Sequence, residues 1–176
     1  AKILPTSPLT YTNLKLKAEG NTKSGMFRGT ASQTHLLGYE YQKINLEGGY
    51  EEELYNATID VDDPNGRMML RAQYDDTHLI PKYELEGKVD SLDLHAMNLV
   101  DIHEGKSFST HVTASLKGHD IDQMTGKVII DYLTKHQEGE DYVMNDIIFN
   151  SHYPDSKFLT MGSESADVTV RGNFAY

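Results

Sequence analysis

The chain of 176 residues carries 27 acidic and 16 basic side chains, so its formal net charge at pH 7 is −11. A charge of this sign repels nucleic-acid phosphates, and the sequence shows no local basic patch, so we expect no nucleic-acid partner. The lack of cysteine in the sequence excludes disulfides, thiolate catalysis and cysteine-ligated metals. No stretch approaches the roughly eighteen consecutive apolar residues of a membrane-spanning helix.

Apolar and polar residues alternate with a period of two along most of the chain, which predicts an all-β protein. One apolar and one polar face per strand is typical of an antiparallel sheet rather than of a buried parallel one. Glycine, proline, asparagine and aspartate stand where the alternation stops. The clearest alternating segments, in chain order, are 14–19, 57–62, 83–90, 108–117 and 167–174. With weaker segments between the turns, they predict about eleven strands.

One short segment departs from this period. Between residues 91 and 99 the spacing hints at a helical turn, with Leu92, His95, Ala96 and Leu99 on one face. The segment is too short to form a stable helix by itself.

The first and last thirds of the chain resemble each other. Leu116 follows Leu16 by 100 positions and is also followed by lysine, and Val170-Arg171 follows Leu70-Arg71 by the same interval. We interpret 14–75 and 112–176 as two copies of a repeat, joined by 76–111. Residues 1–176 are therefore expected to be a single β-rich piece of a longer repeat array, in which neighbouring units cover each other's sheet edges.

Several sequence pieces follow one another in a particular order. They are Leu-x-Leu-Lys-x-x-Gly at 14–20, a glycine at 29, Tyr-x-Tyr-x-x-Ile-x-Leu-x-Gly at 39–48 and Ile-Asp-x-Asp-Asp-Pro-Asn at 59–65. In this order they resemble the TamB/AsmA-like family of envelope proteins of diderm bacteria, as does the stretch 88–99. The resemblance extends over nearly the whole chain from residue 14 and consists of strand and turn residues without a catalytic motif.

The resemblance implies repetitive antiparallel strands curled into an elongated open trough, shaped like a taco and lined with apolar side chains. It also implies a periplasmic location, within a protein that is anchored in the inner membrane and spans the envelope. Family members are associated with phospholipid transport between the two membranes and with outer-membrane biogenesis. An outer-membrane barrel partner would then be reached through other parts of the full-length protein.

A lipid trough needs one apolar face that continues from strand to strand without charges, and the alternation supplies it. Phospholipid acyl chains are thus the expected ligands, in a non-enzymatic protein without cofactor. The residues expected to line the trough are Leu14, Leu16, Ile44, Leu46, Ile59, Val61, Met68, Leu70, Leu85, Val89, Val112, Leu116, Val128, Ile130, Ile147, Phe149, Val168, Val170 and Phe174.

Other interpretations of the same pattern remain open. Periodicity cannot separate an open trough from a closed β-sandwich, since both need one apolar face per strand. A second function is a scaffold that assembles outer-membrane barrel proteins by adding strands to its sheet edge, and exposed edges also suit a homodimer. A third is a carbohydrate-binding sandwich, for which the aromatic cluster would be Tyr39, Tyr41, Tyr50 and Tyr55.

The sequence offers no clear catalytic or metal site. Its eight histidines are scattered and form none of the usual metal signatures. The run from Asp60 to Gly66 superficially resembles a calcium loop, but Pro64 interrupts the ligand spacing and no bidentate glutamate follows, so a turn is expected there. We therefore predict neither catalytic residues nor metal ligands.

Overall fold

The computed structural model describes residues 9–100, 106–120, 124–152, 158–163 and 166–171. A search of these residues found no helix with the length and hydrophobicity of a transmembrane span. The regular elements are eleven strands: β1 (Leu9–Gly20), β2 (Ser24–Leu36), β3 (Tyr39–Glu51), β4 (Leu54–Asp63), β5 (Gly66–Asp75), β6 (Lys82–Leu92), β7 (Lys106–Lys117), β8 (Thr125–Gln137), β9 (Glu140–His152), β10 (Phe158–Gly162) and β11 (Asp167–Arg171).

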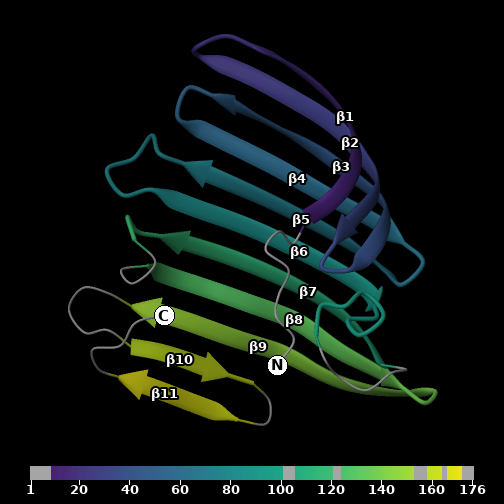
Figure 1. Cartoon of the computed structure of the whole chain (residues 1–176). Coiled ribbons are helices and arrows are strands. Elements are labelled where there is room, and N and C mark those ends of the chain that lie inside the picture. Colours follow the sequence, from purple (N-terminus) through teal and green to yellow (C-terminus); the bar gives the residue numbers. More distant parts are fainter. Residues whose placement is uncertain (1–8, 101–105, 121–123, 153–157, 164–165, 172–176) are drawn as a thin grey trace.

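All eleven strands form one antiparallel sheet, in which each strand pairs with its neighbours in sequence (Figure 1). The prediction of an all-β protein of repetitive antiparallel strands is confirmed, and the sheet is open rather than closed into a barrel. A second layer that would make a sandwich is not found among the described residues. β6 lies within 76–111 and pairs with β5 on one side and β7 on the other.

Strand register decides which side chains share a face of the sheet. Ile59 of β4, for example, lies opposite Leu46 of β3 and Leu70 of β5, so the three side chains lie on the same face. Because side chains alternate along each strand, the residues two positions away lie on that face as well. We call this apolar face the inner face and the opposite, polar one the outer face.

A bulge redirects the end of β6. The register between β6 and β7 shifts after Val89, and Ser91 in the bulge has a left-handed φ of 51°. The extra residue turns Leu92 to face Phe108 of β7. The chain that follows is thereby directed over the inner face.

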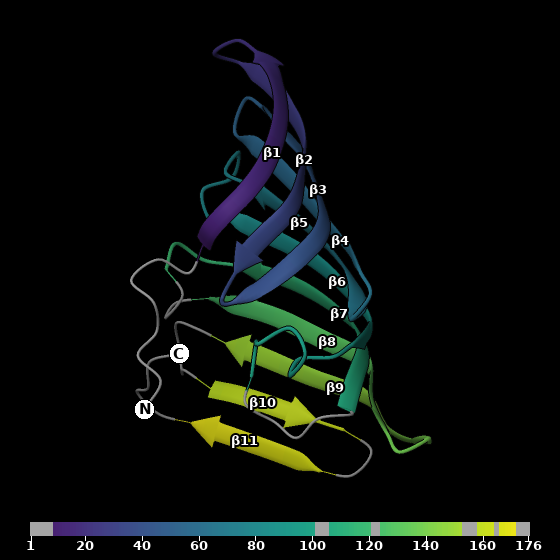
Figure 2. The ribbon, with the colours of Figure 1, turned by 45° about the vertical axis from the view of Figure 1, so that its right-hand side comes forward.

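Residues 93–100, which we call the covering loop, pack on the inner face at one end of the strands. Met97 is 1% exposed and, with Leu92, Tyr41 and Val61, forms the main buried cluster. Asp93 N–H donates to the carbonyl of Asn65 at 2.8 Å, which ties the loop to the β4–β5 turn. Figure 2 shows that the sheet is strongly curved, with β1 and β2 bending over at the N-terminal side.

The prediction that Leu92, His95, Ala96 and Leu99 share one face of a helical turn is partly wrong. A single helical turn does form, in which Met97 N–H donates to the carbonyl of Asp93 and the Asp93 carboxylate accepts from Ala96 N–H. However, Leu99 is 38% exposed and Met97 is the buried residue. The reason is that Asn98 has a left-handed φ of 55°, which ends the turn before Leu99 can join its face.

Candidate functional site

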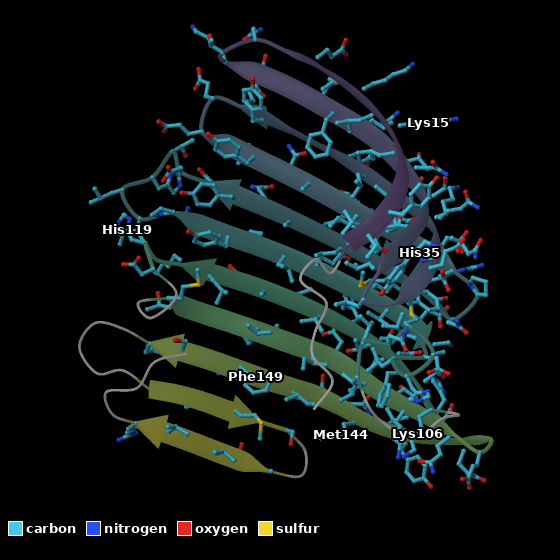
Figure 3. All side chains as sticks on the ribbon, in the orientation of Figure 1. Lys15, His35, Lys106, His119, Met144 and Phe149 are labelled. Carbon is cyan, nitrogen blue, oxygen red and sulfur yellow. The ribbon has the colours of Figure 1, made fainter. Side chains whose placement is uncertain are left out.

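One cross-strand row of the inner face runs through the whole sheet. Its members lie directly opposite one another from β1 to β11, and none carries a charge or a hydrogen-bonding side chain. We call it the central row; it consists of Ala18, Phe27, Gly48, Ala57, Ala72, Leu85, Ala114, Val128, Phe149, Met161 and Val168. In Figure 3, Phe149 lies over the sheet between its two ends, whereas Lys15 projects away from β1.

The register places all the expected trough residues except Phe174 on this inner face, in the central row or in rows beside it. Phe174 lies outside the described residues. Leu85, Val128, Phe149 and Val168 belong to the central row; Leu16, Leu46, Ile59, Leu70, Val112, Ile130 and Ile147 form the next row; Leu14, Ile44, Val61, Met68 and Val89 form the row beyond; and Leu116 and Val170 lie on the opposite side of the central row.

Much of the inner face is open to solvent. Leu16 on β1 is 54% exposed, Leu85 in the middle of the sheet 38%, and Val168 on β11 46%. Monomeric soluble proteins rarely leave contiguous apolar surface of this extent uncovered, and where they do it usually marks a binding site.

The covering loop occupies one part of this face. Ile44, Ile59, Met68 and Val89 pack against the cluster around Met97, and Val61 belongs to that cluster. These five side chains are therefore already in contact with protein. The central row and Leu46, Leu70 and Val112 are not part of that packing.

Four tyrosines line the other side of the central row. Tyr50, Tyr55, Tyr74 and Tyr83 lie directly opposite one another on β3 to β6, and we call them the tyrosine row. The successive ring centroids are 6.2, 5.8 and 5.0 Å apart, with interplanar angles between 28° and 36°. Because the rings stand side by side and face one another, they form a wall rather than a flat platform.

Between the tyrosine row and the covering loop, an apolar strip of the inner face runs across the strands, and we call this strip the groove. In β3 to β5 this strip consists of Gly48, Ala57 and Ala72, and the Phe27 ring lies over Gly48, where an added Cβ would be 2.8 Å from it. The tyrosine row is separated from Val61, under the covering loop, by about six residues of β4, or roughly 20 Å. A hydrocarbon chain is much narrower than this, so the groove has space for more than one.

The aromatic cluster expected from sequence is split between the two ends of the sheet. Tyr39 and Tyr41 pack edge to face near the covering loop, with ring centroids 4.9 Å apart, and Tyr41 is buried. Tyr50 and Tyr55 belong to the tyrosine row instead, together with Tyr74 and Tyr83. A sugar ring stacks on an exposed aromatic face, and here the faces are turned toward neighbouring tyrosines.

A hydrogen-bonded network closes the β4–β5 turn. The Asp63 carboxylate accepts from the hydroxyl of Tyr39, from Gln42 N–H at 3.1 Å and from Asn65 N–H at 3.0 Å, while the Tyr39 oxygen also accepts from the Asn65 amide at 2.9 Å. Asp63 thus serves the turn, as expected. Burial, together with the hydrogen bond to Asp63, raises the pKa of Tyr39 to about 12.

The raised pKa of Tyr39 predicts a loss of stability in strong base. In the unfolded chain tyrosine ionises near pH 10, so Tyr39 contributes its stabilisation fully below that pH and loses it as pH rises toward about 12. Urea unfolding at several pH values above 9 should therefore show a smaller decline for Tyr39→Phe than for the native chain. Tyr11→Phe, at an exposed tyrosine, is the control and should follow the native chain. Identical declines for all three proteins would contradict the role of Tyr39.

The outer face carries cross-strand ion pairs and histidines that sequence spacing does not reveal. Arg28 and Glu47 lie 3.2 Å apart, and Arg71 and Glu86 3.3 Å apart. His111 Nδ1 lies 2.5 Å from the Asp131 carboxylate. The two arginine pairs are largely exposed, so each contributes little to stability.

Three outer-face residues form a chain like that of a serine hydrolase. Ser109 Oγ lies 2.9 Å from His136 Nε2, and His136 Nδ1 lies 2.6 Å from the Asp141 carboxylate. Acyl transfer also needs donors directed at a developing oxyanion beside the nucleophile. The N–H of Ser91 instead donates to Ser109 Oγ itself, at 2.9 Å. The hydrogen bonds described at Ser109 thus connect neighbouring strands and do not form an oxyanion site.

A shallow hollow of about 540 Å³ is lined by the outer-face side chains Arg71, Glu86, Thr113 and Ile129 among others. The central-row residues Ala57, Ala72, Leu85 and Ala114 also contribute to its lining, but none of the tyrosine row does. The Arg71–Glu86 ion pair lies within this lining. The hollow therefore combines these charged side chains with a lining surface that is mostly apolar.

Sequence reasoning missed the tyrosine row and the small residues of the groove. The sequence did contain a signal, because Tyr55 and Ala57 continue the alternation of Ile59 and Val61 toward one end of β4. Tyr74 on β5 and Tyr83 on β6 occupy the corresponding positions at the ends of their apolar faces. Only the register shows that these strand ends coincide.

Comparisons of the chain with protein-family models, with curated proteins and with solved structures found no match.

Proposed function

We propose that the inner face holds phospholipid acyl chains and that the protein acts, without catalysing a reaction, as a segment of a lipid conduit. The observation that carries this proposal is the central row, which crosses all eleven strands of an open sheet without a charge or a polar side chain. A protein whose inner face was only a structural core would be expected to cover this row completely, as the covering loop covers Val61.

The energetics suit a lipid chain. Each methylene that leaves water is stabilised by about 0.8 kcal/mol, so a sixteen-carbon chain gains on the order of 10 kcal/mol or more. A bilayer offers a similar gain, which makes transfer between membrane and groove nearly balanced. Dispersion contacts are non-directional, so a chain can slide along the row without breaking particular bonds.

The sheet dimensions also suit a conduit. Strands in a sheet are about 4.8 Å apart, so eleven of them extend the groove over roughly 48 Å. The groove runs across the strands, and it would lengthen if further strands were added at β1 or β11. Within the described residues, each of these two strands pairs on one side only.

The wider setting is supported by sequence resemblance alone. A TamB/AsmA-like protein would place this segment in the periplasm, within an envelope-spanning protein anchored in the inner membrane. It would connect the segment with outer-membrane biogenesis and with a barrel partner reached through other parts of the protein. Association through the edges of β1 and β11, either with a second copy or with strands of an unfolded barrel protein, is less favoured, because Lys15, Lys17 and Glu19 place charges on β1.

The test uses phospholipid with a photoreactive acyl chain. Leu70→Asp, on the inner face, should lower crosslinking to the protein at least about tenfold, because a carboxylate is costly to bury beside hydrocarbon. Met69→Asp is the matched control, since Met69 is the neighbouring residue on the outer face of the same strand. It should crosslink like the native chain.

Circular dichroism would establish that both variants keep the sheet. If Leu70→Asp does not fold, Val170→Asp replaces it, because Val170 is 45% exposed and its substitution disturbs less packing. Native protein that neither retains phospholipid during purification nor crosslinks to the probe would contradict the proposed function. Crosslinking that is reduced equally by the two β5 variants would contradict the assignment to the inner face.

A further inference from the structure

The tyrosine row lies along one rim of the groove. The β1–β2, β3–β4 and β5–β6 turns are at this end of the sheet, which is the side labelled His119 in Figure 3. Two backbone hydrogen bonds join these turns, from Glu52 N–H to the Lys23 carbonyl at 2.6 Å and from Asp76 N–H to the Glu53 carbonyl at 3.0 Å. The three turns therefore form one continuous rim.

The tyrosine hydroxyls lie at this rim while the rings border the apolar groove. The Tyr50 hydroxyl donates to the carbonyl of Asn21 in the first turn. Burial and a hydrogen bond with Asp76 of the third turn raise the pKa of Tyr74. A side chain with an apolar body and a polar tip suits the boundary between acyl chains and headgroups, where tyrosine is enriched in membrane proteins.

The rim carries an uneven distribution of charge. The second and third turns and the strand ends beside them hold the carboxylates Glu51, Glu52, Glu53, Asp75 and Asp76. Lys23 is the basic residue of the first turn. Lys82 and Lys117 lie opposite each other on β6 and β7 at the same end of the sheet, but the register places them in one outer-face row with Glu51 and Asp75. The turns beside the tyrosine row therefore contribute the acidic groups Glu52, Glu53 and Asp76 and the basic group Lys23.

We propose that this rim binds the headgroup of the lipid whose chains lie in the groove, and that it prefers a zwitterionic headgroup with an ammonium group over a headgroup of net negative charge. This inference rests on the proposed function. The ammonium group is attracted to the carboxylates of the second and third turns, while the phosphate can accept hydrogen bonds from the hydroxyls of Tyr55 and Tyr83 and from Lys23 of the first turn. An anionic headgroup lacks the first attraction, and the net charge of −11 repels it.

The test is a competition between two phospholipids with identical acyl chains. The native chain is incubated with an equimolar mixture of phosphatidylethanolamine and phosphatidylglycerol at low ionic strength, and the bound lipid is identified by native mass spectrometry. Phosphatidylethanolamine should be bound about fivefold in excess, since several partly exposed charge pairs act together. High salt should reduce the excess because it screens these pairs.

Two triple variants locate the preference. Glu52→Gln, Glu53→Gln and Asp76→Asn together remove the carboxylates of the second and third turns and should bring the bound ratio close to one. Glu40→Gln, Glu138→Gln and Glu140→Gln together change the net charge equally at the opposite end of the sheet, so this control should keep the native ratio. Tyr55→Phe with Tyr83→Phe keeps the aromatic wall and should lower the amount of both lipids bound.

The outcomes separate this inference from the proposed function. If the native chain binds both lipids equally, the headgroup preference is wrong while the apolar groove stands. If the excess persists in the rim variant, the preference does not originate at the tyrosine end. If the native chain binds neither lipid, the proposed function and this inference both fail.

Discussion

Met97→Ala is expected to lower the free energy of unfolding by about 2–5 kcal/mol, the usual cost of truncating a fully buried methionine. Met97 is 1% exposed and packs in one cluster with Tyr41, Val61 and Leu92. Truncation would leave a cavity between the covering loop and the sheet, and the backbone bonds that hold the loop limit how far it can collapse. Urea unfolding followed by circular dichroism measures the loss.

Met144→Ala provides the control. Met144 lies on β9 and is 50% exposed, so its truncation should change stability by no more than about 0.5 kcal/mol. Comparable losses in the two variants would show that the covering loop does not pack as described. In that case the inner face would also be more open than the contacts of Val61 indicate.

Gly66→Ala is expected to cost about 3 kcal/mol or more, because two independent effects oppose a side chain at this position. Gly66 has a φ of +134°, a conformation that residues with a Cβ rarely adopt. An added Cβ would also lie 2.5 Å from Leu92 Cα and 3.0 Å from Leu92 N. Both atoms are backbone, so the contact can be relieved only by moving the start of the covering loop.

Gly87→Ala is the matched substitution in the neighbouring strand. A Cβ at Gly87 would lie 3.7 Å from Leu70 Cδ1, which is an ordinary contact, and the residue has no positive φ. Stability should stay within about 1 kcal/mol of the native value, with a gain from the reduced entropy of the unfolded chain. Thermal unfolding of the two variants distinguishes them, and equal midpoints would contradict the described position of Gly66 against Leu92.

The regular part of the fold could be predicted from sequence because alternation is a local property. A residue such as Leu16 or Leu85 lies on the apolar face as soon as its segment forms a strand, whatever the partner strand is. The covering loop could not be predicted in the same way. The burial of Met97 instead of Leu99 depends on the left-handed backbone at Asn98 and on contacts with Val61, which is distant in sequence.

The positions of the tyrosines could not be predicted from sequence either. Tyr39 and Tyr55 are close in sequence, yet they lie at opposite ends of the inner face. Tyr55 and Tyr83 are far apart in sequence but belong to one row through Tyr74. Each strand reverses the chain direction, so separation along the sequence does not measure separation across the sheet.

The amino-acid sequence by itself determined that the chain forms antiparallel strands, each with one apolar and one polar face, because the pleat imposes this period on every segment. Only the tertiary structure decided that the apolar faces align in a single uncharged row from β1 to β11 and that residues 93–100 cover one part of it. Register, bulges and curvature depend on the pairing of all the strands at once. No single segment contains that information.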